Sequence, residues 1–147
     1  MKFSKLTDRI SDLGSDKWLL HLEARKLKKN NPNIIELTIG EPDQPPPEEL
    51  IAICCESMRS GRTKYSNGRG EEILLDALVQ KYQKRTPLKV SRNNFLCLPG
   101  TQTALFAAVL CLTEEEDELL VGYPYYATYE VIIKYSGATI IPIPLHE

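Results

Sequence analysis

The sequence lacks any apolar run close to the roughly 20 residues that a helix needs to cross a membrane. Its first ten residues, MKFSKLTDRI, also lack the continuous apolar core of a secretory signal peptide. Internal repeats and low-complexity segments are absent as well. These absences predict a globular protein in the cytoplasm, without a membrane among its partners.

Metal-binding residues are few. The four cysteines fall in no Cys-x-x-Cys spacing, and the chain has two histidines, His21 and His146, so we expect no metal site. Cys97 and Cys111 lie within apolar runs, which predicts buried thiols. Positive charge is not in excess, because the formal net charge is −2. We therefore expect no nucleic acid as a partner.

The length of 147 residues suits one domain with a core, or part of a larger one. Apolar spacing predicts a helix over residues 6–29, and alternation predicts a strand over 34–40. The elements predicted beyond these are helices over 48–59 and 71–85, a strand over 95–98 before a helix from 101, a strand over 118–123, a helix over 124–137 and a strand over 138–145. Because strands alternate with helices from Phe95 onward, we expect an α/β fold with a mainly parallel sheet and helices on both faces.

The stretch FLCLPGTQTALFAAVLCL, residues 95–112, places small polar residues between two apolar segments. A helix leaves about four backbone N–H groups unpaired at its start, and its dipole adds partial positive charge there. The turn at Gly100 to Gln102 therefore predicts an anion site, to which Thr101 adds a hydroxyl. An ordinary capped helix is the alternative. The helix behind the turn is apolar almost all round, which predicts that it is buried.

Five segments in this order resemble the aspartate-aminotransferase-like class I and II enzymes of fold type I, which depend on pyridoxal phosphate. The segments are IELTIGEPD (35–43), TKYSNGRGEEILLDAL (63–78), LPGTQTAL (98–105), YPYYATYE (123–130) and GATIIPIPL (137–145). The resemblance covers essentially the whole chain. It implies the N-terminal portion of the cofactor-binding large domain of that fold, apparently truncated. Leu75 departs from the pattern, since the family usually has arginine there.

The resemblance also implies which residues would bind pyridoxal 5'-phosphate. Gly100, Thr101 and Gln102 would hold its phosphate, in agreement with the anion site predicted from the turn. Tyr126 would stack on the pyridine ring, where a flat aromatic face fixes the plane of the ring. A tyrosine of the protein core is the alternative for Tyr126.

Two more residues receive a role from the resemblance. Tyr65 would reach the phosphate bound to the neighbouring subunit of a homodimer, although an ordinary loop tyrosine is the alternative. Gly40 would lie beside the substrate carboxylate, where a side chain would obstruct binding. Residues 1–45 would form the N-terminal helix and first strand, which pack with the small domain in the family. Residues 46–147 would form the first, incomplete part of the large domain.

The implied activity is transfer of an amino group between an L-amino acid and a 2-oxo acid by a ping-pong mechanism. No catalytic residue is expected in this chain, because the Schiff-base lysine of the family lies downstream of the strand that ends near Leu145. We therefore expect the chain alone to be inactive. Two alternatives stay open: a non-catalytic fragment that binds a ligand or a partner, and a lyase or synthase of the same fold that uses the same cofactor.

Overall fold

The computed structural model describes residues 2–11, 13 and 15–146, and of residues 15–17 it describes the backbone alone. The chain divides into two compact units. Unit 1 combines Met1–Glu41 with Gln102–Glu147, and unit 2 consists of Pro42–Thr101. Each unit is described by itself.

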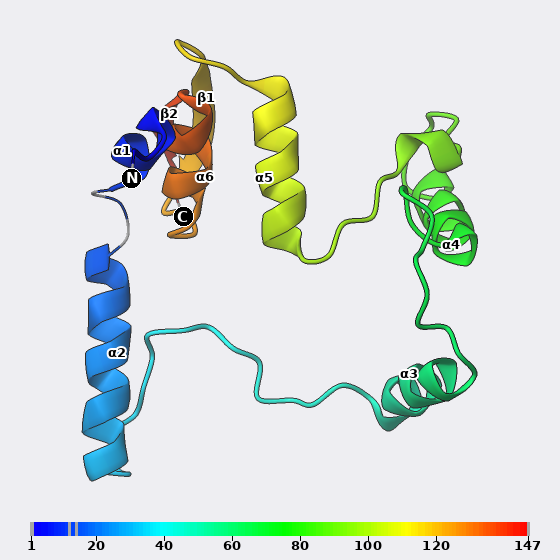
Figure 1. The fold of residues 1–147 in the computed structure, drawn as a ribbon, viewed down its shortest axis with the longest axis horizontal. Helices are drawn as coiled ribbons and strands as arrows, with labels where there is room; N and C mark the ends of the chain where they lie inside the picture. Colours follow the sequence, from blue (N-terminus) through cyan, green and yellow to red (C-terminus); the bar gives the residue numbers. More distant parts are fainter. Residues whose placement is uncertain (1, 12, 14, 147) are drawn as a thin grey trace. The chain divides into compact units, whose positions relative to one another are not determined.

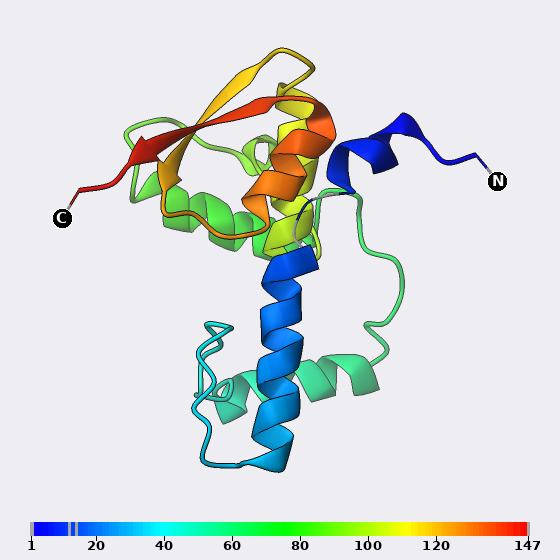
Figure 2. The ribbon, with the colours of Figure 1, turned by 90° about the vertical axis from the view of Figure 1, so that its left-hand side faces the viewer.

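Unit 1 contains a parallel pair of strands, β1 (Glu118–Tyr123) and β2 (Thr139–Pro144), with Glu118 opposite Thr139. Helix α6 (Tyr129–Ser136) connects them. Figures 1 and 2 show the two strands side by side with α6 next to them. The helix ends at Gly137, whose φ of 96° is left-handed backbone that glycine adopts without strain. Both predicted strands and the closing glycine are confirmed, although α6 begins later than the predicted start at residue 124.

The core of unit 1 lies between helix α5 (Thr101–Leu112), helix α6 and one face of the sheet. Its buried side chains are Val109, Ile132, Ile133 and Ala138. Leu119 and Ile140 are opposite each other in the register, and both pack against this cluster. Successive strand residues point to opposite faces, and Leu120 is 70% exposed. Helices that cover the second face of the sheet therefore stay a prediction.

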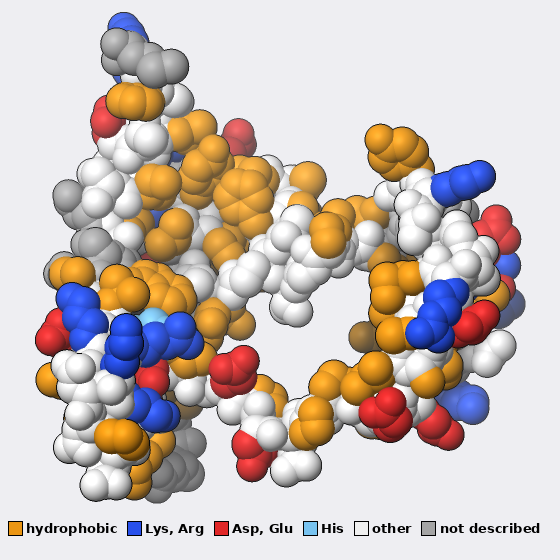
Figure 3. Space-filling model, turned by 60° about the horizontal axis from the view of Figure 1, so that its bottom comes forward, with side chains coloured by type: hydrophobic (Ala, Val, Ile, Leu, Met, Phe, Trp, Pro, Cys, Tyr) orange, Lys and Arg blue, Asp and Glu red, His pale blue; other side chains and the backbone are white. Residues whose placement is uncertain are grey.

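Helix α5 is far more exposed than its apolar sequence predicts. Val109 is its buried residue, whereas Leu112 is 80% exposed and Cys111 is exposed too. The predictions that the helix and the Cys111 thiol are buried are wrong for the described residues, because the helix packs along one side only. Hydrophobic side chains lie open elsewhere on the surface as well (Figure 3).

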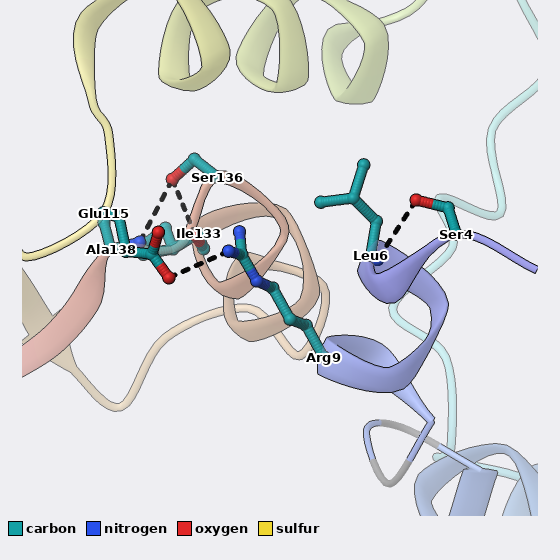
Figure 4. Close-up of polar contacts among 7 residues, drawn as sticks. All are labelled: Ser4, Leu6, Arg9, Glu115, Ile133, Ser136 and Ala138. Atoms are coloured by element: carbon teal, nitrogen blue, oxygen red, sulfur yellow. Dashed lines mark hydrogen bonds and ion pairs between the residues drawn. The ribbon is translucent and has the colours of Figure 1, made fainter.

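The N-terminal segment forms two helices, α1 (Lys5–Ile10) and α2 (Ser15–Asn30), where the sequence predicts one over 6–29. Between them the sequence contains Gly14, and glycine weakens a helix by about 1 kcal/mol relative to alanine; residues 12 and 14 lie outside the described residues. Helix α1 contacts α6. Arg9 at the end of α1 forms an ion pair with Glu115 at 2.9 Å (Figure 4).

Two predicted strands, over 34–40 and 95–98, do not form. A strand needs a neighbour that pairs with its backbone N–H and C=O groups. Among the described residues, β1 and β2 pair with each other and no strand pairs with either of these two segments. The apolar pattern was therefore correct for an extended chain but did not show whether a partner strand is present.

Unit 2 contains α3 (Glu48–Arg59), α4 (Glu72–Gln83) and a short 3-10 helix, η1 (Arg92–Asn94). The helices predicted over 48–59 and 71–85 are confirmed. Arg92 donates two hydrogen bonds of 2.6 Å to the carboxylate of Asp76 and one of 2.9 Å to Glu72. Leu75 of α4 is 3% exposed. The leucine at the family's arginine position therefore contributes to packing here.

Candidate functional site

The turn before α5 has the backbone shape that the sequence predicts. Gly100 has a φ of 86°, and a Cβ added to it would meet no atom within 4 Å. Helix α5 begins at the next residue, Thr101, and runs for 12 residues. Its first-turn N–H groups and its dipole favour an anion at this end. The space around Gly100 leaves the backbone accessible to such an anion.

The side chain of Gln102, in the first turn of α5, contacts another part of unit 1. The hydroxyl of Thr128 donates a hydrogen bond of 3.0 Å to Oε1 of Gln102. Thr128 lies just before α6, in the loop that follows β1. Because Oε1 already accepts this hydrogen bond, the Nε2 group of Gln102 is the part of the amide that can donate to a ligand.

Tyr126 lies in the same loop as Thr128 and is 60% exposed. Its ring meets the ring of Tyr129 edge to face, with 6.1 Å between the centroids. The exposure contradicts the alternative that Tyr126 is a tyrosine of the core. A large part of its ring is thus available to a planar ligand.

Gly40 and Tyr126 line the same hollow, although they are far apart in the sequence. The hollow has a volume of about 410 Å³. Trp18 and His21 contribute to it from α2, residues 38–40 from the segment after α2, and residues 126–128 from the loop after β1. A Cβ added to Gly40 would meet no protein atom within 4 Å. A side chain at position 40 would therefore extend into free space at the hollow.

A buried polar cluster borders this hollow. His21 is 6% exposed, and its Nδ1 lies 2.7 Å from Oγ1 of Thr38 and 3.0 Å from Oε1 of Glu36. The hydroxyl of Thr38 donates to the same carboxylate oxygen at 2.9 Å. This hydrogen bond, followed by the electrostatic attraction of His21 and Arg25, holds the pKa of Glu36 below its ordinary value against the opposing effect of burial. Glu36 is therefore ionised at neutral pH.

Tyr65 is fully exposed and belongs to unit 2. It lines a second hollow of about 540 Å³ together with Cys54, Arg62 and Glu71. Arg62 pairs with Glu71 at 3.3 Å. The pKa of Glu71 is lowered first by a hydrogen bond from Ser66 and then by the charge of Arg62. Tyr65 thus belongs to a different unit from Gly40, Gln102 and Tyr126.

Trp18, His21, Thr38 and Thr128 have no site role in the sequence analysis. In the described part of the chain, no three His, Cys, Asp or Glu side chains group as metal ligands would. No helix in the part of the chain that the structure describes is long and apolar enough to span a membrane.

Comparison with known proteins identifies the family. The sequence profile of aminotransferase class I and II matches residues 32–147. The chain therefore belongs to this family. Its recognition as an N-terminal part of a fold-type-I aminotransferase, and the α/β fold class, are confirmed.

Relatives and solved structures agree with this assignment. The chain is 31% identical over 145 residues to an arginine–pyruvate transaminase from Pseudomonas aeruginosa, covering 99% of this chain and 37% of the relative. It superimposes on an alanine aminotransferase from Pyrococcus furiosus with a TM-score of 0.86 and 25% identity, covering 99% and 37% of the two chains. For an aspartate aminotransferase from Thermotoga maritima the TM-score is 0.83 and the identity 29%, with 94% and 37% covered. The chain thus spans little more than a third of these proteins.

Proposed function

We propose that this chain contributes the phosphate turn and the ring-stacking wall of a pyridoxal-phosphate aminotransferase, which transfers an amino group between an L-amino acid and a 2-oxo acid. The observation that carries the proposal is the hollow shared by Gly40 and Tyr126, since the family resemblance assigns these two residues to the substrate and to the cofactor ring. The hydrogen bond between Thr128 and Gln102 links the phosphate turn to the same loop.

The residues present fit pyridoxal phosphate. A phosphate dianion suits the open backbone at Gly100, because it would meet first-turn N–H groups of α5 and no side chain at that residue. Gln102 would donate from Nε2 while Thr128 holds its Oε1. The exposed ring of Tyr126 offers a flat apolar face to the pyridine. When bound, the cofactor supplies an electron sink for the electrons released at the substrate Cα.

Gly40 contributes by lacking a side chain. It lines the hollow, and the space next to its Cα is free of protein atoms. Any larger residue would occupy part of the volume that a substrate carboxylate needs. In our proposal Gly40 thus admits the substrate, Tyr126 fixes the plane of the ring, and Gly100 to Gln102 bind the phosphate.

Further expectations follow from the family resemblance. The Schiff-base lysine would lie outside this chain, so the chain itself would bind the cofactor without turnover. Residues 1–45 would pack with the small domain and residues 46–147 would begin the large domain. Tyr65 would serve the neighbouring subunit of a homodimer, and the protein would work in the cytoplasm. A ping-pong order of substrates would follow from the shared cofactor.

Equilibrium dialysis of the chain with pyridoxal phosphate, pyridoxal and inorganic phosphate tests the proposal. We expect pyridoxal phosphate to bind at least about tenfold more tightly than pyridoxal, because hydrogen bonds to a charged group are strong. Inorganic phosphate should compete. Gly100→Val should weaken the binding of pyridoxal phosphate and of inorganic phosphate. Tyr126→Leu should weaken the binding of pyridoxal phosphate and leave that of inorganic phosphate unchanged.

Two outcomes would overturn the proposal: equal affinity for pyridoxal and its phosphate, or borohydride trapping of the cofactor on one specific lysine of this chain. The second would show that the chain carries its own catalytic lysine. A transamination assay on a longer protein that contains this sequence would separate an aminotransferase from a lyase of the same fold.

A further inference from the structure

The hollow beside Gly40 combines aromatic walls with one polar group that is almost fully buried. Trp18 and Tyr126 supply the aromatic surface, and His21 supplies the polar group. The ring of Trp18 meets that of His21 edge to face at 5.8 Å. Among the residues of the hollow that the structure describes there is no arginine or lysine. Its side chains therefore suit a flat, uncharged group more than an anionic one, and the glycine at position 40 is left for the substrate carboxylate.

The hydrogen bonds around His21 determine which ring nitrogen carries a proton. Glu36 is ionised, so its oxygen can only accept, and the hydroxyl of Thr38 already gives its proton to that oxygen. Nδ1 lies within hydrogen-bond distance of both oxygens. It must therefore be the donor to both. In the neutral imidazole, Nε2 then carries the lone pair and accepts a hydrogen bond.

Nε2 is the nitrogen left for a ligand. Both polar contacts of the ring within the described residues are made by Nδ1. None of the buried side-chain nitrogens or oxygens in the described part of the chain lacks a partner. His21 lines the hollow, and our inference takes Nε2 as the atom that faces a ligand there.

We propose that His21 is a specificity residue that selects substrates whose flat, apolar side chain ends in a hydrogen-bond donor, such as a hydroxyphenyl group. This inference rests on the proposed function, because it takes the hollow as the place of the substrate side chain. The aromatic side chain would pack against Trp18, since the proposed function assigns Tyr126 to the cofactor ring, and its hydroxyl would donate to Nε2 of His21.

The charges behind the ring favour this class over dicarboxylic substrates. The Glu36 carboxylate lies 3.0 Å from the ring, and Arg25 Nε lies 3.9 Å from that carboxylate, where its charge acts on Glu36. A second carboxylate in the hollow would meet the field of Glu36 and the lone pair of Nε2. A phenol meets neither penalty.

Titration of the full chain with unreactive substrate analogues, followed by NMR, tests the inference. The probes are 3-(4-hydroxyphenyl)propanoate, 3-phenylpropanoate and glutarate. We expect the hydroxylated probe to bind roughly three- to tenfold more tightly than 3-phenylpropanoate, as one neutral hydrogen bond allows, and glutarate to bind most weakly. The ¹⁵N signal of His21 Nε2 should shift with the hydroxylated probe only.

Two variants of one residue separate recognition from folding. Asparagine places its amide near the position of Nδ1, and glutamine places it near Nε2. His21→Asn should keep the bond to Glu36 and lose the preference for the hydroxyl, whereas His21→Gln should retain part of the preference. Trp18→Leu should weaken the binding of both aromatic probes and leave the ratio of their dissociation constants unchanged.

Three results would overturn the inference: an unchanged hydroxyl preference in His21→Asn, tighter binding of glutarate than of the aromatic probes, or no binding of any probe. If pyridoxal phosphate still binds in preference to pyridoxal, these results refute the role of His21 and leave the proposed function standing. Loss of that preference would refute the proposed function itself.

Discussion

The hydroxyl of Thr128 donates a 3.0 Å hydrogen bond to Oε1 of Gln102, and this bond joins the first turn of α5 to the loop that carries Tyr126. The family resemblance assigns Gln102 and Tyr126 to opposite ends of the same cofactor. Thr128 has no role in the sequence pattern. In the structure it is hydrogen-bonded to Gln102 from the loop that carries Tyr126.

Loss of either partner of this bond should weaken cofactor binding. We expect Gln102→Leu and Thr128→Val each to raise the dissociation constant for pyridoxal phosphate by roughly three- to tenfold. The double variant should add little, because both changes remove the same interaction. Thr139→Val, at an exposed residue of β2, serves as the control. Fully additive losses in equilibrium dialysis would show that the two residues act independently.

Local signals in the sequence were enough for the helices of unit 2. The predicted and observed bounds of α3 agree, because Pro47 precedes the helix and a Ser-Gly pair follows it. The strands predicted over 34–40 and 95–98 failed for a nonlocal reason: a strand depends on a partner, which the apolar pattern of one segment does not reveal. Burial is nonlocal too: Leu112 of α5 is exposed although its apolar helix was predicted to be buried.

The candidate site likewise combines features that local sequence signals predict with contacts that depend on the fold. The turn at Gly100 could be predicted from its residues, since glycine before an apolar helix is a local signal. The shared hollow of Gly40 and Tyr126 required the fold. Glu36 and Thr38 are two residues apart in an extended segment, so their side chains can lie on the same side. This spacing could have predicted the contact between Glu36 and Thr38. Their contact with His21 of α2 depends on tertiary packing and could not be predicted from the sequence.

The ion pair between Asp76 and Arg92 should make unit 2 sensitive to acid. Hydrogen bonds from Arg92 hold the pKa of Asp76 below its ordinary value. A carboxyl group with a lowered folded-state pKa stabilises the fold above its unfolded pKa, near 4, and this stability is lost as the pH falls through the folded value.

Carboxyl NMR titration measures this effect directly. We expect Arg92→Met to raise the pKa of Asp76 towards its ordinary value. In urea unfolding, Asp76→Asn should be less stable than the parent chain at pH 7, and the difference should shrink below about pH 4. Glu56→Gln on α3 provides an exposed carboxylate for comparison. A pKa of Asp76 that does not respond to Arg92→Met would contradict the assignment.

Gly137 should not tolerate a side chain. Its φ is 96°, and an added Cβ would lie 3.0 Å from Nη1 of Arg9 and 3.2 Å from the Cα of Glu115. Arg9 and Glu115 form the ion pair of Figure 4, so the guanidinium would have to move. We expect Gly137→Ala to lower the free energy of unfolding by about 1–2 kcal/mol.

The control for this change is Gly68→Ala. A Cβ at Gly68 would meet no atom within 4 Å, and its φ is not positive. In thermal unfolding, the free energy of unfolding should therefore change by less than about 0.5 kcal/mol. Equal losses at both glycines would mean that neither the left-handed backbone of Gly137 nor the closeness of Arg9 and Glu115 disfavours a side chain there.

Tyr65 allows a test of whether two subunits share a site. Its side chain is fully exposed, and in our proposal it binds the phosphate held by the neighbouring subunit. Tyr65→Phe should therefore weaken pyridoxal phosphate binding in the associated protein. Binding to dilute, dissociated chains should not change, which makes the dissociated protein its own control.

A mixture of two defective variants makes the test stricter. In a mixed dimer of Tyr65→Phe with Gly100→Val, one site combines the intact turn of the first chain with the intact Tyr65 of the second. The other site carries both defects. We expect dialysis of the mixture to reveal a class of sites with the parent affinity that neither variant shows alone. If Tyr65 instead served its own subunit, every site in the mixture would hold one defect, and no parent-like class would form.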